Sequence, residues 1–274
     1  MTTRRICIGV FDSGFGGLTV LKALLKLIPH ADYVYFGDTA RLPYGSKSAE
    51  TVARYAVGAA HYLEQHRAQM LVIACNTATA LALDQITKAA SVPVVGVVDP
   101  GADRAAGSST KKKVVVIGTE ATVASHAYLK ALEKRGTRAH EKACPLFVPL
   151  VEEGWIEHPV TEQVARIYLK EAFSEGFEDA DVLLLGCTHY PLIKNVLHRI
   201  APDHVTIVDS ADATADAVGR LVRRVPLPDP AQPERRKLPR ITFLATDSVE
   251  KFKRLGPQFL GLPVKDVHHV DLKE

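Results

Sequence analysis

Two cysteines in this sequence occupy closely matching positions. Cys75 follows the apolar run at residues 70–74, and Cys187 follows a second apolar run at 183–186. Each run predicts a buried strand, and each cysteine leads into a predicted helix, the second with Pro191 suited to a first helical turn. Free N–H groups at a helix start favour a thiolate and can hold a carboxylate. The pair therefore predicts an enzyme with two acid/base groups facing one substrate.

The bland alternative is that these cysteines only pack in the core. A lone cysteine at a strand end is more often a small buried hydrophobe than a catalyst, but two with polar neighbours favour catalysis. Cys7 and Cys144 lack such neighbours and are predicted to be packing residues. Cys187-Thr188-His189 lacks third and fourth ligands at typical spacing, so we expect no metal site. His189 could also be a polar residue whose hydrogen bonds are satisfied within the protein and which has no catalytic role.

Composition places the chain among ordinary globular proteins. Its 274 residues are 47% hydrophobic and 24% charged, with a formal net charge of +3. This length predicts two domains, and so small a charge requires no nucleic-acid partner. Four cysteines without CxxC spacing argue against a disulfide scaffold or a zinc ribbon. We also expect no signal peptide and no membrane span, which would need roughly 18–20 apolar residues, and hence a cytoplasmic location.

Strands and helices alternate along the first part of the chain. Strands are predicted at 6–11, 33–37, 70–74 and 92–98, with helical patterns between them, including one over 48–65. Such alternation predicts a parallel α/β sheet covered on both faces. A glycine loop at 12–17 follows the first strand, but it lacks the spacing of a phosphate-binding fingerprint.

The same order recurs after a polar break at 107–113. Strands are predicted at 114–118, 138–143, 183–186 and 205–208, a helix over 161–174, and an irregular segment at 151–155 after Cys144-Pro145. Asp12 precedes Cys75 by 63 residues, and Thr119 precedes Cys187 by 68. This repetition predicts an internal duplication, in which two similar parallel-sheet α/β domains place equivalent loops at one cleft that holds the active site.

The tail is too short for a domain of its own. A helix over 210–224, a loop or crossover at 226–239 with five prolines and the basic run 235–237, a strand at 241–245 and a helix from Ser248 are predicted. We expect the tail to return to the first unit, which gives domains of 1–98 plus 210–274 and of 99–209. The alternative is that it extends the second unit.

Four motifs in order resemble those of the glutamate racemases, within the aspartate/glutamate racemase family: GVFDSGFGGLTV, YFGDTARLPYGSKS, IACNTATA and GCTHYPL. The resemblance spans residues 6 to about 209. It implies a cofactor-independent enzyme that interconverts L- and D-glutamate and supplies D-glutamate for peptidoglycan synthesis, working as a cytoplasmic homodimer. The related aspartate racemases share the two-cysteine plan, so aspartate remains an alternative substrate.

The resemblance also implies roles for individual residues. Cys75 and Cys187 are the two bases, with Asp12 beside Cys75 and His189 beside Cys187. Glutamate is held by Ser13, Pro43, Tyr44, Gly45, Asn76, Thr77, Thr119, Thr122 and Thr188. Asp38 and Glu152 hold the groups that contact the substrate without contacting it themselves. For this role Glu152 is chosen over the adjacent Glu153.

The chemistry expected from the residues agrees. Inverting an α-carbon requires removal of a proton from one face and delivery of a proton to the other, which two thiols on opposite walls of a cleft can do. The competing class is a binding protein, either a cleft domain pair that only holds a ligand or a protein that contacts DNA or a DNA enzyme through Lys111–Lys113 and Arg235–Lys237. Those short basic runs are more typical of solvated loops.

Overall fold

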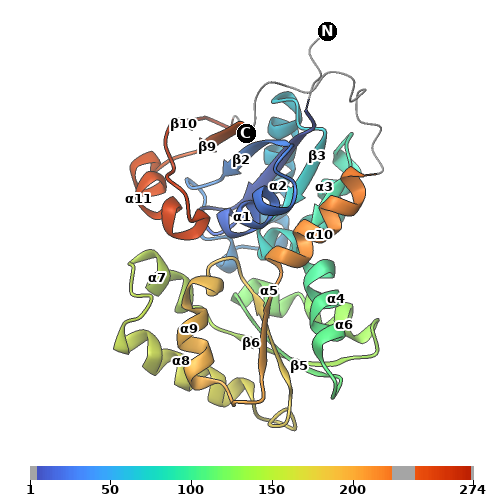
Figure 1. The fold of residues 1–274 in the computed structure, drawn as a ribbon, viewed down its shortest axis with the longest axis vertical. Helices are drawn as coiled ribbons and strands as arrows, with labels where there is room; N and C mark the ends of the chain where they lie inside the picture. The colour runs from blue at the N-terminus through green and yellow to red at the C-terminus, as the bar shows by residue number, and fades with distance from the viewer. Residues whose placement is uncertain (1–4, 224–237, 273–274) are drawn as a thin grey trace.

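The computed structural model describes residues 5–223 and 238–272. Strands and helices alternate along the chain and build two parallel sheets, one in each half of the molecule (Figure 1). Within the described residues, every helix is too short or too polar to span a bilayer.

The first sheet has six strands in the order β10-β9-β2-β1-β3-β4. Their bounds are β1 Cys7–Asp12, β2 Asp32–Gly37, β3 Met70–Ile73, β4 Val94–Gly96, β9 Ile241–Ala245 and β10 Val267–His269. Every pairing in it is parallel. All four residues of β3 are buried, as expected for a strand with both faces covered by helices.

The second sheet has four parallel strands in the order β6-β5-β7-β8. They are β5 Lys113–Gly118, β6 Arg138–Ala143, β7 Val182–Gly186 and β8 Thr206–Asp209. This order repeats β2-β1-β3-β4 strand for strand. The predicted fold, two similar parallel-sheet α/β units, is confirmed.

Helices cover both sheets and supply loops at their ends. They are α1 Leu18–Leu27, α2 Ala49–Gln65, α3 Asn76–Ala89, α4 Val98–Ser108, α5 Glu120–Ala124, α6 Ala127–Glu133, α7 Phe147–Glu152, α8 Pro159–Ala172, α9 Lys194–Ile200, α10 Ala211–Val222 and α11 Val249–Leu260, with short 3-10 helices η1 Tyr44–Ser46 and η2 Tyr190–Ile193. Helix α2 shows how the sequence specifies them. The Ser48 side chain caps its first turn by accepting a hydrogen bond from the Thr51 amide, and Val52, Ala56 and Leu63 line its buried face at helical spacing.

The tail contributes to the first sheet. Strand β9 pairs with β2, β10 pairs with β9, and α10 packs against α1. The domain boundaries of 1–98 plus 210–274 and 99–209 stay a prediction. The proline-rich loop at 226–239 lies largely outside the described residues, and the basic run at 235–237 entirely so.

Several predicted elements differ from the structure. The segment after Cys144-Pro145, predicted to be irregular, contains α7, with Pro149 in a first turn where proline is tolerated. The fourth strand is shorter than 92–98, because Val98 already belongs to α4. In place of a loop at 119–122 followed by one helix, which the sequence predicts, the segment after Thr119 forms two helices, separated at His126, whose φ is 55°. The chain after Cys187 enters a 3-10 helix before α9 begins.

Candidate active site

The two cysteines stand at the carboxyl ends of β3 and β7, the strands that occupy equivalent places in the two sheets. Both are buried, with 5% of Cys75 and 7% of Cys187 exposed. Contacts between the two units join these ends, because Thr77 Oγ1 at the start of α3 lies 2.9 Å from Thr119 Oγ1 after β5. Ligand sites of parallel α/β sheets form at this edge.

Cys75 is the N-cap of α3. Its Sγ accepts a hydrogen bond from the Ala78 amide at 3.4 Å and donates one to the Ser13 hydroxyl at 3.4 Å. Burial, with the charge of Asp12 adding to it, raises the pKa of Cys75 to about 12. The Ala78 amide at the helix start lowers the pKa of Cys75, as expected, but the cost of burying a charge outweighs this hydrogen bond.

Asp12 ends β1 and is completely buried. The Gly14 amide donates to its Oδ2 at 2.9 Å, while Oδ1 has no hydrogen-bond partner among the described residues. Burial raises the pKa of Asp12 and the charge of His189 opposes this. The carboxyl group thus has a free acceptor atom and an increased tendency to hold a proton.

Cys187 has a different neighbourhood, built around His189. Nε2 of His189 lies 3.2 Å from Oε1 of Glu152, and Lys251 Nζ donates to Glu152 Oε2 at 2.7 Å. Burial alone would lower the pKa of His189, but hydrogen bonds and charges from Cys187 and Glu152 outweigh it and raise the pKa to about 10. Burial likewise opposes ionisation of Glu152, yet His189 and Lys251 lower its pKa. The partners of His189 therefore favour its protonated form beside the Cys187 thiol.

The structure distinguishes Glu152 from Glu153. Glu152 contacts His189, while Glu153 is exposed beyond the end of α7. Sequence reasoning missed Lys251, which lies on α11 of the tail, where no motif marks it. It also missed Tyr128, whose hydroxyl donates to Asn76 Oδ1 at 2.6 Å. Only packing of the two units brings these pairs together.

The glycine loop at 12–17 lies against the Cys187 segment. A Cβ atom on Gly16 would stand 2.1 Å from Thr188 Oγ1 and 2.6 Å from His189 Nδ1. A Cβ atom on Gly45 would stand 2.8 Å from Thr119 Cβ. Glycine is thus required for close approach of the two units rather than for phosphate binding.

Several buried polar side chains directly follow the cysteines in the chain or contact those that do. Thr122 Oγ1 lies 2.9 Å from Thr119 Oγ1 and 3.2 Å from Thr77 Oγ1, so three hydroxyls from both units form one cluster. Asn76 Nδ2 is buried and makes no hydrogen bond among the described residues. Thr188 is buried as well. Unpaired buried donors and acceptors are costly unless a ligand or water satisfies them, so these groups are suited to hold a polar ligand.

Asp38 binds the Tyr44 side chain rather than either thiol. Its carboxylate accepts hydrogen bonds from the Tyr44 hydroxyl at 2.5 Å, the Thr246 hydroxyl at 2.9 Å and the Arg41 guanidinium at 3.1 Å. The Tyr44 side chain is therefore already engaged, and the Pro43-Tyr44-Gly45 loop can offer a ligand its backbone. Pro43 itself is exposed.

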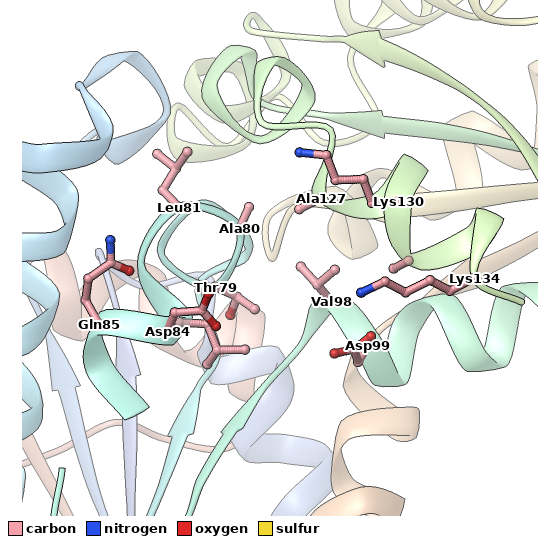
Figure 2. A pocket seen from close by; sticks show the side chains of 12 residues that line it. Thr79, Ala80, Leu81, Asp84, Gln85, Val98, Asp99, Ala127, Lys130 and Lys134 are labelled. Carbon is pink, nitrogen blue, oxygen red and sulfur yellow. The ribbon is translucent and has the colours of Figure 1, made fainter. Parts of the chain in front are cut away.

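A separate pocket lies where α3, α4 and α6 meet. It has a volume of about 220 Å³, and Figure 2 shows Asp84 of α3 and Lys134, which follows the last residue of α6, among its labelled side chains. Thr79 lines this pocket, and its hydroxyl donates to the Ile73 carbonyl at 2.9 Å. This hydrogen bond links the pocket to the end of β3, two residues before Cys75. Neither Cys75 nor Cys187 lines it, so it is distinct from the thiol pair.

Comparison with known proteins agrees with this geometry. A family model described as Asp/Glu/Hydantoin racemase matches residues 8–218. A glutamate racemase of Koribacter versatilis (strain Ellin345) is 56% identical, over 99% of each chain, and one of Geobacter metallireducens is 45% identical, over 97% of each chain. The crystal structure of glutamate racemase from Francisella tularensis in complex with D-glutamate superposes with a TM-score of 0.89 at 34% identity, over 99% of both chains. With a matching model over most of its length and full-length relatives this similar, the chain belongs to the Asp/Glu/Hydantoin racemase family.

Proposed function

We propose that this protein is a glutamate racemase that interconverts L- and D-glutamate without a cofactor, with Cys75 and Cys187 as its two acid/base groups. The observation that carries the proposal is the pair of buried thiols at equivalent strand ends, each with a different titratable neighbour. The similar proteins named as glutamate racemases support glutamate as the substrate, and the Francisella structure was solved with D-glutamate.

In the proposed reaction, the α-carbon lies between the two sulfur atoms. For L-glutamate, the Cys187 thiolate removes the α-proton and becomes a thiol, while the Cys75 thiol donates its proton to the opposite face and becomes a thiolate. The raised pKa of Cys75 suits this thiol to act as the proton donor, and His189 lies beside Cys187 on the other side of the site. The reverse direction exchanges the two roles. Asp12 and His189 assist proton movement, each at its own thiol.

The substrate is held by groups that are buried and only partly satisfied. The Asn76 Nδ2 amide and the hydroxyls of Thr77, Thr119, Thr122 and Thr188 are suited to the two carboxylates. The Asp12 Oδ1 atom is an acceptor suited to the ammonium group. Ser13 and the backbone of the Pro43-Tyr44-Gly45 loop complete the proposed binding set, with Asp38 and Glu152 behind it.

The physiological part of the proposal follows from the family resemblance. An enzyme that forms D-glutamate would supply it for peptidoglycan synthesis. The family resemblance further supports a cytoplasmic homodimer as the working form.

The test is to add purified protein to L-glutamate without cofactor and to follow the loss of optical rotation. We expect racemisation of glutamate and much slower racemisation of aspartate. Faster turnover of aspartate would favour the aspartate racemase alternative, and binding of glutamate without turnover would favour a ligand-binding protein. Absence of turnover with or without pyridoxal phosphate would refute the proposal.

A further inference from the structure

The tail of the chain reaches the candidate active site through helix α11. Figure 1 shows α11, in the half that contains the first sheet, close to α7 in the other half, and the ion pair between Lys251 and Glu152 joins them. Phe252, Leu255 and Phe259 bury one face of α11. This packing fixes the helix, and with it the base of the Lys251 side chain.

Two side chains of α11 contact the pair formed by His189 and Glu152. Lys251 Nζ lies 2.7 Å from Glu152 Oε2, and the Phe259 ring meets the His189 ring edge-on with 5.2 Å between centroids. Lys251 also lies over the ring of Phe15 in the glycine loop, 5.6 Å from its centroid. Lys251 and Phe259 thus each contact one member of the His189–Glu152 pair, which lies beside Cys187.

We propose that Lys251 is a positioning residue for the reaction, which holds the Glu152 carboxylate against His189 and so maintains the charge beside Cys187. One oxygen of Glu152 faces Lys251 and the other faces His189, so both oxygens of the carboxylate are held in place. Because Lys251 and Glu152 lie on opposite sides of the junction between the two units, this arrangement exists only when the units stand together as they do here. The inference rests on the proposed function.

The electrostatic surroundings give the proposal a direction. His189 and Lys251 both lower the pKa of Glu152, while burial and the nearby Asp12 carboxyl group favour its protonated form. His189 in turn responds to Cys187, Glu152 and Asp12. Removing the Lys251 charge therefore raises the pKa of Glu152. A protonated Glu152 no longer stabilises the His189 cation, so activity should be lost at a higher pH than in the native protein.

The experiment compares the pH dependence of kcat/KM for L-glutamate in the native protein and in Lys251→Met. Lys251 is one-third exposed, so the effect is modest. The acidic limb should move up by about half a pH unit, which is roughly a threefold loss at a fixed acidic pH. Lys251→Arg should restore the native profile. Lys253→Met is the matched control, because Lys253 lies on the same helix and pairs with exposed Glu250.

A double variant separates positioning from general damage to the fold. Glu152→Gln removes the carboxylate on which Lys251 acts, so adding Lys251→Met to it should cause no further shift of the acidic limb. Independent, multiplying effects of the two substitutions, or a Lys251→Met profile identical to that of Lys253→Met, would overturn the inference. Melting temperatures of all variants show whether each is folded. Failure of the native protein to racemise glutamate would instead refute the proposed function.

Discussion

The two halves of the site solve the same problem with different neighbours. Cys75 caps an α-helix, bonds to the Ala78 amide and the Ser13 hydroxyl, and lies near a buried carboxyl group. Cys187 precedes a 3-10 helix and lies near a histidine that is supported by Glu152 and Lys251. Burial thus raises the pKa of one thiol, while the other lies beside a histidine whose protonated form is favoured.

This difference arises within a duplicated frame. The strand orders β2-β1-β3-β4 and β6-β5-β7-β8 put both cysteines at equivalent ends. An acid and a base that exchange roles need equivalent positions on opposite sides of the substrate, but at any moment they need unequal protonation. Duplication supplies the positions, and the neighbours supply the inequality.

The largest effect is expected from removing either thiol. Cys75→Ser and Cys187→Ser should each lower racemisation by at least about 10²–10⁴-fold, because an alcohol is too weak an acid or base at neutral pH. Optical rotation measures the loss, and Cys7→Ser, which lies outside the site, should remain active. In D₂O, product formed early by the native protein should carry deuterium at Cα while the remaining substrate stays protiated. Protium in the first product would contradict a mechanism with two bases.

The next effect separates the two halves. Asp12→Asn should slow mainly the reaction of D-glutamate, in which Cys75 is the base, and His189→Asn mainly that of L-glutamate. We expect roughly tenfold to a hundredfold lower kcat, less than for a group that transfers the proton itself. Since enantiomers have equal free energies, kcat/KM must fall equally in both directions, so KM has to compensate. Equal loss of kcat in both directions for both variants would show that the halves are not specialised.

A smaller effect concerns the substrate. Glutamate exceeds aspartate by one methylene, which an apolar pocket distinguishes by only about 1–3 kcal/mol. Polar groups at the distal carboxylate, among which we place Thr188, discriminate between the two acids better than an apolar pocket does, because a shorter substrate leaves them unpaired. Thr188→Ala should therefore reduce glutamate turnover and narrow the preference over aspartate by about tenfold. An unchanged ratio of kcat/KM for the two acids would remove Thr188 from this role.

The smallest effect is on stability. The pKa of His189 is raised from 6.5 to about 10 by its partners. The folded state therefore binds the proton more tightly than the unfolded state, and this stabilisation is complete below pH 6.5 and is lost as the pH rises towards 10. His189→Asn should lose less melting temperature than the native protein between pH 7 and pH 10, by roughly 2–4 °C. Parallel melting curves for the two proteins would contradict the raised pKa.

Much of the fold was predictable from local patterns. Short apolar runs, the glycine loop and helical spacing are encoded within a few residues, and they indicated the repeated α/β order and the strand ends that carry both cysteines. The failures were local as well. Helix α7 was not predicted, because it contains Pro149, and proline disrupts most helices although it is tolerated in a first turn. The 3-10 turn after Cys187 resembles an α-helix start in sequence.

The sequence by itself determined the thiol pair, its repeated setting and the family resemblance. Only the tertiary structure decided which partners each thiol has and which protonation state burial favours. Glu152 and Lys251 lie 99 residues apart in the chain, Asn76 and Tyr128 lie 52 apart, and Asp38 and Thr246 lie 208 apart. No local pattern specifies such pairs. The raised pKa of Cys75 likewise depends on exclusion of water by the whole fold, a property that no short segment of the chain possesses.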